Sequence, residues 1–499
     1  MKKLVLALTG FLVTGILLAG CKMSPTGYTA REGFLHPGVL HTQEDLETLR
    51  ALIDRWDGIT RVTNPDGTVT VTTDLASAVV PSTPQADPAA TANPATASGQ
   101  DFNLNESVVE PERWAAWREL KAANRRGYAE YRAYTSWNSL KADGNAAHTY
   151  AVKGPYVYLA RDGTYGGNKT NIETDFRAAY LNALMWMLTG DKRHAMKSFE
   201  IMDGYARTAR GILDGGTGDY RLMTGLQGSV FACAAELIRY GKDTVNHEDS
   251  GLTDRQFVNI ENSMRNVWIP CMDRFYGNSP DTQGNVGLCV TSAYLGMAIF
   301  LDDEEMYIKA LNFWLNGFDN GNLANYVHPV SGQNQETKRD QGHAVLGLMK
   351  LGVVCEMFYK QGDNVYSAFD NSLWKGSEFS ARYNMGDNNF TNTPREFDPY
   401  SEWYYFDALW DDVSGHNPEV IYGDLINSFE PGTGSRGSTK PAFEILYNHY
   451  HRRQGMPMPW TEAYLPRDGE GYDTADSPPA YASFLVAGPD VFRELGLAP

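Results

Sequence analysis

The run Gln335-Glu336-Thr337-Lys338-Arg339-Asp340-Gln341-Gly342-His343 continues directly into Ala344-Val345-Leu346-Gly347-Leu348-Met349. The second half has the apolar pattern of a buried helix, and the first half gathers amides, carboxylates, cations and an imidazole at its start. Burying such groups is costly unless they meet partners or a ligand. The stretch therefore predicts a core helix with a functional site at its N-terminal end.

Helical patterns dominate the rest of the chain. After a first helix that follows Thr42, we expect helices at about 112–131, 172–189, 191–212, 226–241, 253–275, 287–302, 303–317, 341–361, 366–383, 417–428 and 440–454. Thr42, Asp191, Thr253 and Asp303 are the expected residues at helix starts. The short connections indicate antiparallel helix pairs. The sequence thus predicts an all-α fold, a single large domain shaped as an (α/α) toroid or incomplete barrel.

Strand-like patterns are restricted to short segments. Residues 155–158 form one, and residues 68–72 form another after the turn Asn64-Pro65-Asp66-Gly67, which predicts a small hairpin. The hairpin falls in a block at about 58–111 whose Pro-, Ala-, Thr- and Ser-rich part, 81–99, is typical of a low-complexity insertion.

The N-terminal segment is expected to direct the protein to the cell envelope. Lys2 and Lys3 precede the apolar run 4–18, and Leu18-Ala19-Gly20-Cys21 has the pattern of a bacterial lipobox. We expect a lipoprotein signal peptide at 1–20, lipidation of Cys21, a tether at 21–35 and the α-helical domain at 36–499. The expected location is the bacterial cell envelope, in the periplasm or at the outer-membrane surface.

Charge and cysteine content narrow the partners. The formal net charge of −18 argues against nucleic acid and against a basic membrane-binding face, so the expected membrane contact is the lipid anchor alone. An anionic ligand would then be held by a few placed cations. Cys233, Cys271, Cys289 and Cys355 are widely separated, which favours buried thiols and shows no zinc-type spacing. We expect no metal and no cofactor; the oligomeric state is left open.

Five segments together resemble the alginate-lyase-like polysaccharide lyases. In chain order they are 36–42 (HPGVLHT), 175–184 (DFRAAYLNAL), 284–286 (GNV), 336–343 (ETKRDQGH) and 444–450 (EILYNHY). The fourth is similar to the Glu-x-x-Arg-Asp-Gln-x-His run of that family, whereas Val286 stands where relatives often have Trp. The resemblance implies an (α/α) barrel that cleaves a uronate-containing glycan, alginate or β-1,4-glucuronan, by β-elimination.

That chemistry explains the residue types. A base removes the C5 proton beside the uronate carboxylate, whose charge must be neutralised, and an acid assists the leaving oxygen on C4. The catalytic candidates are Asn285, Arg339, His343 and Tyr447. The resemblance implies that Asn285 contacts the substrate carboxylate, although a helix N-cap is the structural alternative. Arg339 suits a forked pair with a carboxylate, or an ion pair with Glu336 or Asp340. His343, four residues after Arg339, would act as base or neutraliser.

Further residues are candidates for substrate binding or for a different chemistry. The substrate-binding candidates are Gln341, Tyr326, Arg177, Gln227 and His449. Tyr447 and His449 are equally consistent with helix packing. A glycoside hydrolase would instead use two carboxylates, for which Glu336 and Asp340 are the candidates. A non-catalytic glycan-binding lipoprotein is the other alternative.

Overall fold

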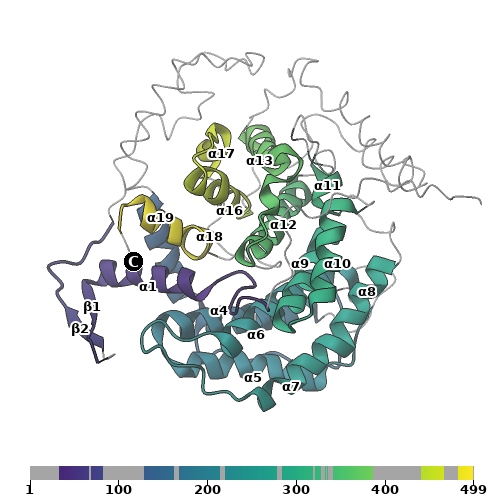
Figure 1. The fold of residues 1–499 in the computed structure, drawn as a ribbon. Coiled ribbons are helices and arrows are strands. Elements are labelled where there is room, and N and C mark those ends of the chain that lie inside the picture. The colour runs from purple at the N-terminus through teal and green to yellow at the C-terminus, as the bar shows by residue number, and fades with distance from the viewer. Residues whose placement is uncertain are drawn as a thin grey trace, which may run out of the picture.

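The computed structural model describes residues 33–66, 69–81, 129–161, 168–213, 220–277, 284–317, 321–327, 332, 334, 336, 341–385, 440–465 and 481–497. Within them the chain is mostly helical, and the helices follow one another around a ring (Figure 1). The helices and strands are α1 (Gln43–Asp57), β1 (Ile59–Thr63), β2 (Val69–Thr73), η1 (Gly144–Ala146), β3 (Tyr158–Leu159), α4 (Lys169–Thr189), α5 (Lys192–Thr208), β4 (Gly211–Ile212), α6 (Tyr220–Tyr240), α7 (Asp254–Ser263), η3 (Met264–Trp268), α8 (Ile269–Gly277), α9 (Gly284–Phe300), α10 (Glu304–Asn316), α11 (Leu323–Tyr326), α12 (Gln341–Lys360), η4 (Val365–Ser367), α13 (Ala368–Met385), α16 (Phe443–Tyr447), η7 (Asn448–Arg453), α17 (Pro459–Tyr464), α18 (Ala482–Leu485) and α19 (Gly488–Glu494).

Four helices, α4, α6, α9 and α12, form the inner wall of the ring, because they are buried on nearly every face. Neighbours in this wall pack closely. A Cβ added at Gly225 of α6 would lie 2.5 Å from the carbonyl carbon of Cys289 in α9, and one at Gly228 would lie 3.0 Å from Ala293. The contacts advance along both helices together, so α6 and α9 run parallel. Helix α12 is long and apolar enough to cross a membrane, but it packs against α9 inside the toroid.

Each outer helix runs back along an inner helix and so connects it to the next inner helix. Helix α5 packs on α4, α10 on α9, and α13 on α12. The connections are short: Gly190 and Asp191 alone separate α4 from α5, and residues 301–303 separate α9 from α10. These are antiparallel helix pairs, so the predicted all-α toroid is confirmed.

The helix starts were predictable from side-chain chemistry. The Thr42 side chain accepts a hydrogen bond from the Asp45 N–H, and the Asp45 carboxylate accepts from the Thr42 N–H, which completes a capping box. Asp191, Thr253 and Asp303 are N-caps of α5, α7 and α10, as expected. The Asp191 and Asp303 carboxylates accept from first-turn N–H groups that have no partner within their own helix, whereas at Thr253 the Gln256 side chain accepts from the Thr253 N–H.

Several predicted helices differ from the observed ones. The helix expected to end at 131 continues to residue 142, and the one expected at 440–454 contains the π-helical segment η7. The run 253–275 is interrupted by the π-helical turn η3, where the Ile269 N–H bonds to the Met264 carbonyl. Pro270 follows at once; it has no N–H and would clash with the preceding turn of a regular α-helix, which a wider turn relieves. The run 191–212 ends as a helix at Thr208, because 211–212 pair in parallel with β3. Tertiary pairing overrides the local pattern there.

The hairpin and the cysteines follow expectation. Strands β1 and β2 pair antiparallel across the predicted turn, with Ile59 opposite Thr73 and Thr63 opposite Val69. Cys233, Cys271, Cys289 and Cys355 are free thiols. The signal peptide, Cys21, residues 112–128 and the expected helix at 417–428 lie outside the described residues, and the domain boundaries remain predictions.

The two ends of the toroid differ in character. At one end the segment before α1 covers the C-terminal ends of inner helices: His36 Nδ1 lies 2.7 Å from Glu236 Oε1 in α6, and Gln361, just after α12, donates to the Gly38 carbonyl at 2.8 Å. His36 also lies 3.1 Å from Asp302, just after α9. The N-terminal ends of α6, α9 and α12 therefore lie together at the opposite end of the ring.

Candidate functional site

The polar centre at this opposite end is the carboxyl group of Glu336, which is 2% exposed. The Asn285 backbone N–H donates to Glu336 Oε2 at 2.9 Å, and the Asn285 side-chain amide donates to Oε1 at 2.8 Å and to Oε2 at 2.9 Å. Asn285 is the second residue of α9 and is itself 1% exposed. Its amide nitrogen is thus directed inward, to a carboxyl group of the same protein.

Tyr326 joins this centre to the next inner helix. Its hydroxyl donates to Glu336 Oε2 at 3.0 Å and lies 3.4 Å from the Ala344 carbonyl oxygen in the first turn of α12. Gly347 leaves the room for it: a Cβ there would lie 1.8 Å from the Tyr326 hydroxyl oxygen. Because Tyr326 is fully buried, its position suits a residue that holds the site in place, and it does not suit one that contacts a polymer.

Two further candidates lie in the first turn of α12. His343, immediately before Ala344, is partly exposed. Gln341 is buried, and its side-chain oxygen accepts a hydrogen bond from Asn384 of α13 at 2.8 Å. Gln341 therefore ties α12 to its outer helix. Arg339 and Asp340 lie outside the described residues.

The structure brings together Asn285, Tyr326 and the start of α12 with His343, but it places Tyr447 and His449 elsewhere. His449 stacks on Tyr366 with ring centroids 3.7 Å apart and meets Tyr359 edge-on at 5.0 Å. Tyr359 is sixteen residues beyond His343 on α12, which is about 24 Å along the helix axis. Burial lowers the pKa of His449 to about 4. Tyr447 stacks on His451 with centroids 4.6 Å apart, on the same segment.

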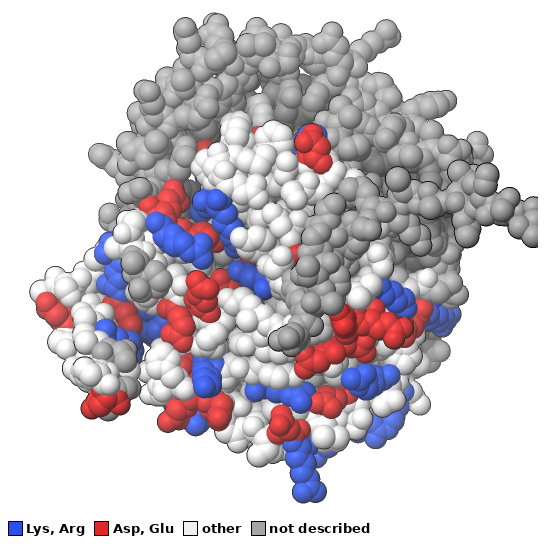
Figure 2. Space-filling model, viewed as in Figure 1, with Lys and Arg blue, Asp and Glu red and all other residues white. Residues whose placement is uncertain are grey.

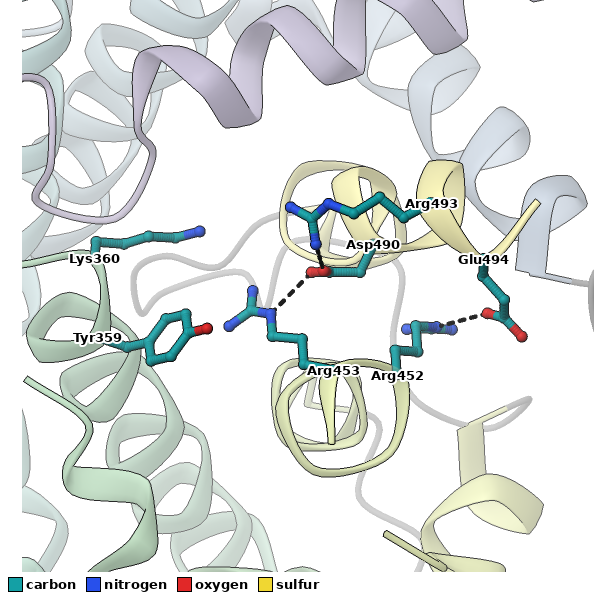
Figure 3. A pocket seen from close by; sticks show the side chains of 7 residues that line it. All are labelled: Tyr359, Lys360, Arg452, Arg453, Asp490, Arg493 and Glu494. Carbon is teal, nitrogen blue, oxygen red and sulfur yellow. Dashed lines mark hydrogen bonds and ion pairs between the residues drawn. The ribbon is translucent and has the colours of Figure 1, made fainter. Parts of the chain in front are cut away.

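The aromatic residues around His449 and Tyr447 form a second group. A cavity of about 480 Å³ lies beside this second group, at the seam where α19 packs against α1 (Figure 3). Its lining comes from the end of α12, from η7 and from α19: Tyr359, Lys360, Arg452, Arg453, Asp490, Arg493 and Glu494.

Lys360, Arg452 and Arg453 are held in buried ion pairs, whereas Arg493 is half-exposed. Arg453 donates two hydrogen bonds to Glu356, at 2.8 and 2.9 Å, and Lys360 lies 2.7 Å from Asp45 of α1. Burial alone would raise the pKa of Glu356, but Arg453 and Lys360 outweigh it and hold that pKa far below its usual range. The network therefore ties the first helix to the last ones.

The remaining candidates line the inner wall at greater depth. Arg177 lies in the middle of α4 and is partly buried, and Gln227 lies on α6 and is 1% exposed. Closer to the helix starts, Arg274 of α8 lies over the Tyr220 ring, 5.1 Å from its centroid, and Arg221 lies 5.4 Å from it. This aromatic–cation group at the start of α6 was not predicted, because its members come from different helices.

The charged side chains on the protein surface are of both signs. On the face shown in Figure 2, acidic and basic side chains of the described residues are interspersed. Among the residues that the structure covers, no group of three or more His, Cys, Asp or Glu side chains could hold a metal ion.

The role of Glu336 in the structure differs from those that its sequence context suggests. The sequence indicates an ion-pair partner of Arg339 or a hydrolytic carboxylate at this position; the structure shows that Glu336 accepts hydrogen bonds from Asn285 and Tyr326. The signal was present in Gly284: its φ is +38°, and a Cβ there would lie 2.6 Å from Glu336 Cδ. A glycine before Asn285 is what lets the carboxyl group approach.

Comparison with known proteins gives the family. The family model described as alginate lyase matches residues 118–390, more than half of the chain. No curated protein matches the sequence. Among solved structures, alginate lyase A1-III from Sphingomonas species A1 is similar at 11% identity, with 72% of this chain and 94% of that chain covered and a TM-score of 0.46. An alginate lyase from Bacteroides ovatus is similar at 13% identity, with 69% and 99% covered and a TM-score of 0.37.

The family assignment depends on the family model, because the matched residues include the inner helices and both Asn285 and Glu336. The chain belongs to the alginate lyase family and is a polysaccharide lyase that acts on a uronate-containing, anionic glycan.

Proposed function

We propose that the site at the paired N-terminal ends of α9 and α12 cleaves alginate or a β-1,4-glucuronan by β-elimination. The observation that carries this proposal is the juxtaposition of Asn285 with the first turn of α12, through Glu336 and Tyr326. His343 lies in that turn. Arg339 lies two residues before α12, so it is close to His343 in the chain.

The proposed roles follow from the chemistry of the elimination. Arg339 pairs with the substrate carboxylate through a forked hydrogen bond, which neutralises the charge that opposes removal of the C5 proton. His343, partly exposed, takes up that proton or shares in neutralising the carboxylate. Asn285 orients the sugar at the same place.

The direction of the inner helices supports an anionic substrate at this end. Each helix has a partial positive charge at its N-terminus, and the starts of α6, α9 and α12 face the same way. Arg221 and Arg274, around Tyr220 at the start of α6, add cations and an aromatic face suited to a charged sugar. In a chain of net charge −18, such local groups must do the binding.

The identity of the tyrosine is part of the proposal that experiment decides. Tyr447 is the sequence-based candidate, but its neighbours, His451 and Arg452, belong to the second group. Tyr326 is close to Asn285 but fully buried. The variants Tyr326→Phe and Tyr447→Phe distinguish the two candidates, because replacing the acid–base tyrosine should lower kcat by a factor of about 10²–10⁴.

The first experiment measures ultraviolet absorbance of unsaturated uronate with protein lacking residues 1–21. The panel is polymannuronate, polyguluronate, glucuronan, hyaluronan and chondroitin. We expect a rise on one polymer, lost in His343→Ala and Arg339→Ala and kept in the control His247→Ala, which alters an exposed imidazole. Reducing ends without absorbance would contradict the elimination.

We also propose that the mature protein is anchored through a lipid on Cys21 in the bacterial cell envelope. The run Leu18-Ala19-Gly20-Cys21 after an apolar segment supports this. Fractionation of cells expressing the full chain should find it in membranes, and Cys21→Ala should release it. Membrane association that persists in Cys21→Ala would contradict the anchor.

A further inference from the structure

Glu336 occupies a position that needs a physical explanation, because a carboxyl group buried to 2% exposure is costly without compensation. Among the described residues, three groups donate to it: the Asn285 N–H at 2.9 Å, the Asn285 side-chain amide at 2.8 and 2.9 Å, and the Tyr326 hydroxyl at 3.0 Å. Two of the three come from Asn285. The carboxyl group is therefore built around that residue.

This arrangement removes the rotational freedom of the Asn285 amide. An acceptor carboxyl group can be faced only by the NH₂ end, since turning the amide by 180° would place its oxygen against another oxygen. The Asn285 carbonyl oxygen is consequently directed away from Glu336. The bond from the Asn285 backbone N–H to the same carboxyl group fixes the start of α9 as well.

The same carboxyl group sets the spacing between two inner helices. Tyr326 donates to it and also reaches the Ala344 carbonyl in the first turn of α12. Glu336 thereby links Asn285 of α9 to the turn that carries His343. An error of about 1 Å between reacting groups costs about 100-fold in rate, so this link bears directly on catalysis.

We infer that Glu336 is a positioning residue of the lyase site: its buried carboxyl group orients the Asn285 amide and, through Tyr326, fixes the distance between the starts of α9 and α12. The inference rests on the proposed function for its kinetic part. Glu336 acts through Asn285 and does not touch substrate, which also removes it as a candidate hydrolytic acid.

The kinetic test uses Glu336→Gln, which keeps the size of the side chain but turns one acceptor atom into a donor that opposes the Asn285 amide. Loss of hydrogen bonds to a charged group predicts a fall in kcat of about 10- to 100-fold. We expect KM to change by less than about 3-fold, because the cations proposed to bind the sugar, Arg221, Arg274 and Arg339, are unaltered. The matched control is Glu378→Gln, which changes another carboxyl group, on a partly buried residue of α13, that accepts backbone N–H bonds from Trp460 and Thr461 of α17. Its kcat should equal that of the wild type.

A double-mutant cycle separates positioning from general destabilisation. If Glu336 acts through Asn285, Glu336→Gln causes little further loss of kcat in an Asn285→Ala background. Fully additive losses in the double variant, or an unchanged kcat in Glu336→Gln alone, would overturn the inference. Gly284→Ala provides an independent perturbation, since its Cβ would displace the Glu336 carboxyl group, and it should reproduce the kinetic defect.

A structural readout keeps the inference testable without activity. In a crystal structure of Glu336→Gln we expect the Asn285 side chain to be rotated and the Tyr326 hydroxyl to be shifted, whereas Glu378→Gln leaves both in place. An unmoved Asn285 would refute the positioning role. If the wild type cleaves no polymer of the panel, the proposed function fails, and this crystallographic comparison still decides what Glu336 does.

Discussion

The pH dependence of stability can be worked out from one buried histidine, His41. It is 3% exposed, and its Nε2 lies 2.6 Å from the Tyr180 hydroxyl of α4. Burial lowers the pKa of His41 to about 4, with Lys360 contributing in the same direction and Asp45 opposing it. In the unfolded chain the imidazole regains a pKa of about 6.5.

The sign of the effect follows from proton binding. Between pH 6.5 and pH 4 the unfolded chain binds a proton at His41 that the native protein does not bind. The stabilisation is therefore complete above about pH 6.5 and is lost as the pH falls towards 4. A difference of about 2.5 pKa units at about 1.4 kcal/mol per unit corresponds to a loss of stability of about 2 kcal/mol at pH 5, about 3 kcal/mol at pH 4 and about 3.4 kcal/mol at still lower pH.

Calorimetry of wild type and His41→Gln at pH 7.5 and pH 5 measures this contribution. Glutamine keeps a polar atom near the Tyr180 hydroxyl and does not titrate. With an unfolding entropy of about 2.1 cal/mol/K per residue, the chain changes Tm by about 1 °C per kcal/mol. The fall in Tm between the two pH values should thus be about 2 °C smaller in His41→Gln, and His247→Gln should behave as wild type. Equal falls in wild type and His41→Gln would refute the reasoning.

Three further predictions follow from the packing and the site. Glu356→Gln should lower the unfolding free energy in urea by about 3–5 kcal/mol, because Arg453 loses its forked partner. Gly225→Ala should destabilise the protein by about 1–3 kcal/mol in the same assay, since its Cβ has no room against α9. Asn285→Asp should reduce kcat on the cleaved polymer by at least about 100-fold, measured by absorbance, because it sets a second carboxylate against Glu336; an unchanged kcat would contradict the placement.

Much of the fold was predictable because its causes are local. The helix starts at Thr42, Asp191, Thr253 and Asp303 depend on side chains within three residues of the backbone groups they satisfy. The apolar pattern after Gln341 needs only a period near 3.6 to indicate a buried helix. By contrast, β4 depends on a partner more than fifty residues earlier in the chain, which local patterning cannot indicate.

Some residues of the candidate site could be identified from the sequence, and others could not. Asn285, Tyr326 and His343 could be named from their residue types and neighbours, and the structure brings their segments together. Tyr447 and His449 carried an equally suggestive pattern, but helix packing places them beside the seam that Arg453 helps to close. Nothing in a local sequence distinguishes a tyrosine that faces a cleft from one that packs between helices.

The helical class, the capped helix starts and the kinds of chemistry available follow from the order of the residues, since propensity, capping and apolar periodicity act over a few residues. The contact of Glu336 with Asn285 and Tyr326 follows from packing, because Glu336 lies 51 positions from Asn285 and 10 from Tyr326 in the chain. Such a contact forms only when parallel inner helices set their starts side by side. That arrangement is a consequence of packing around the whole ring, and it is what turns separate polar residues into one site.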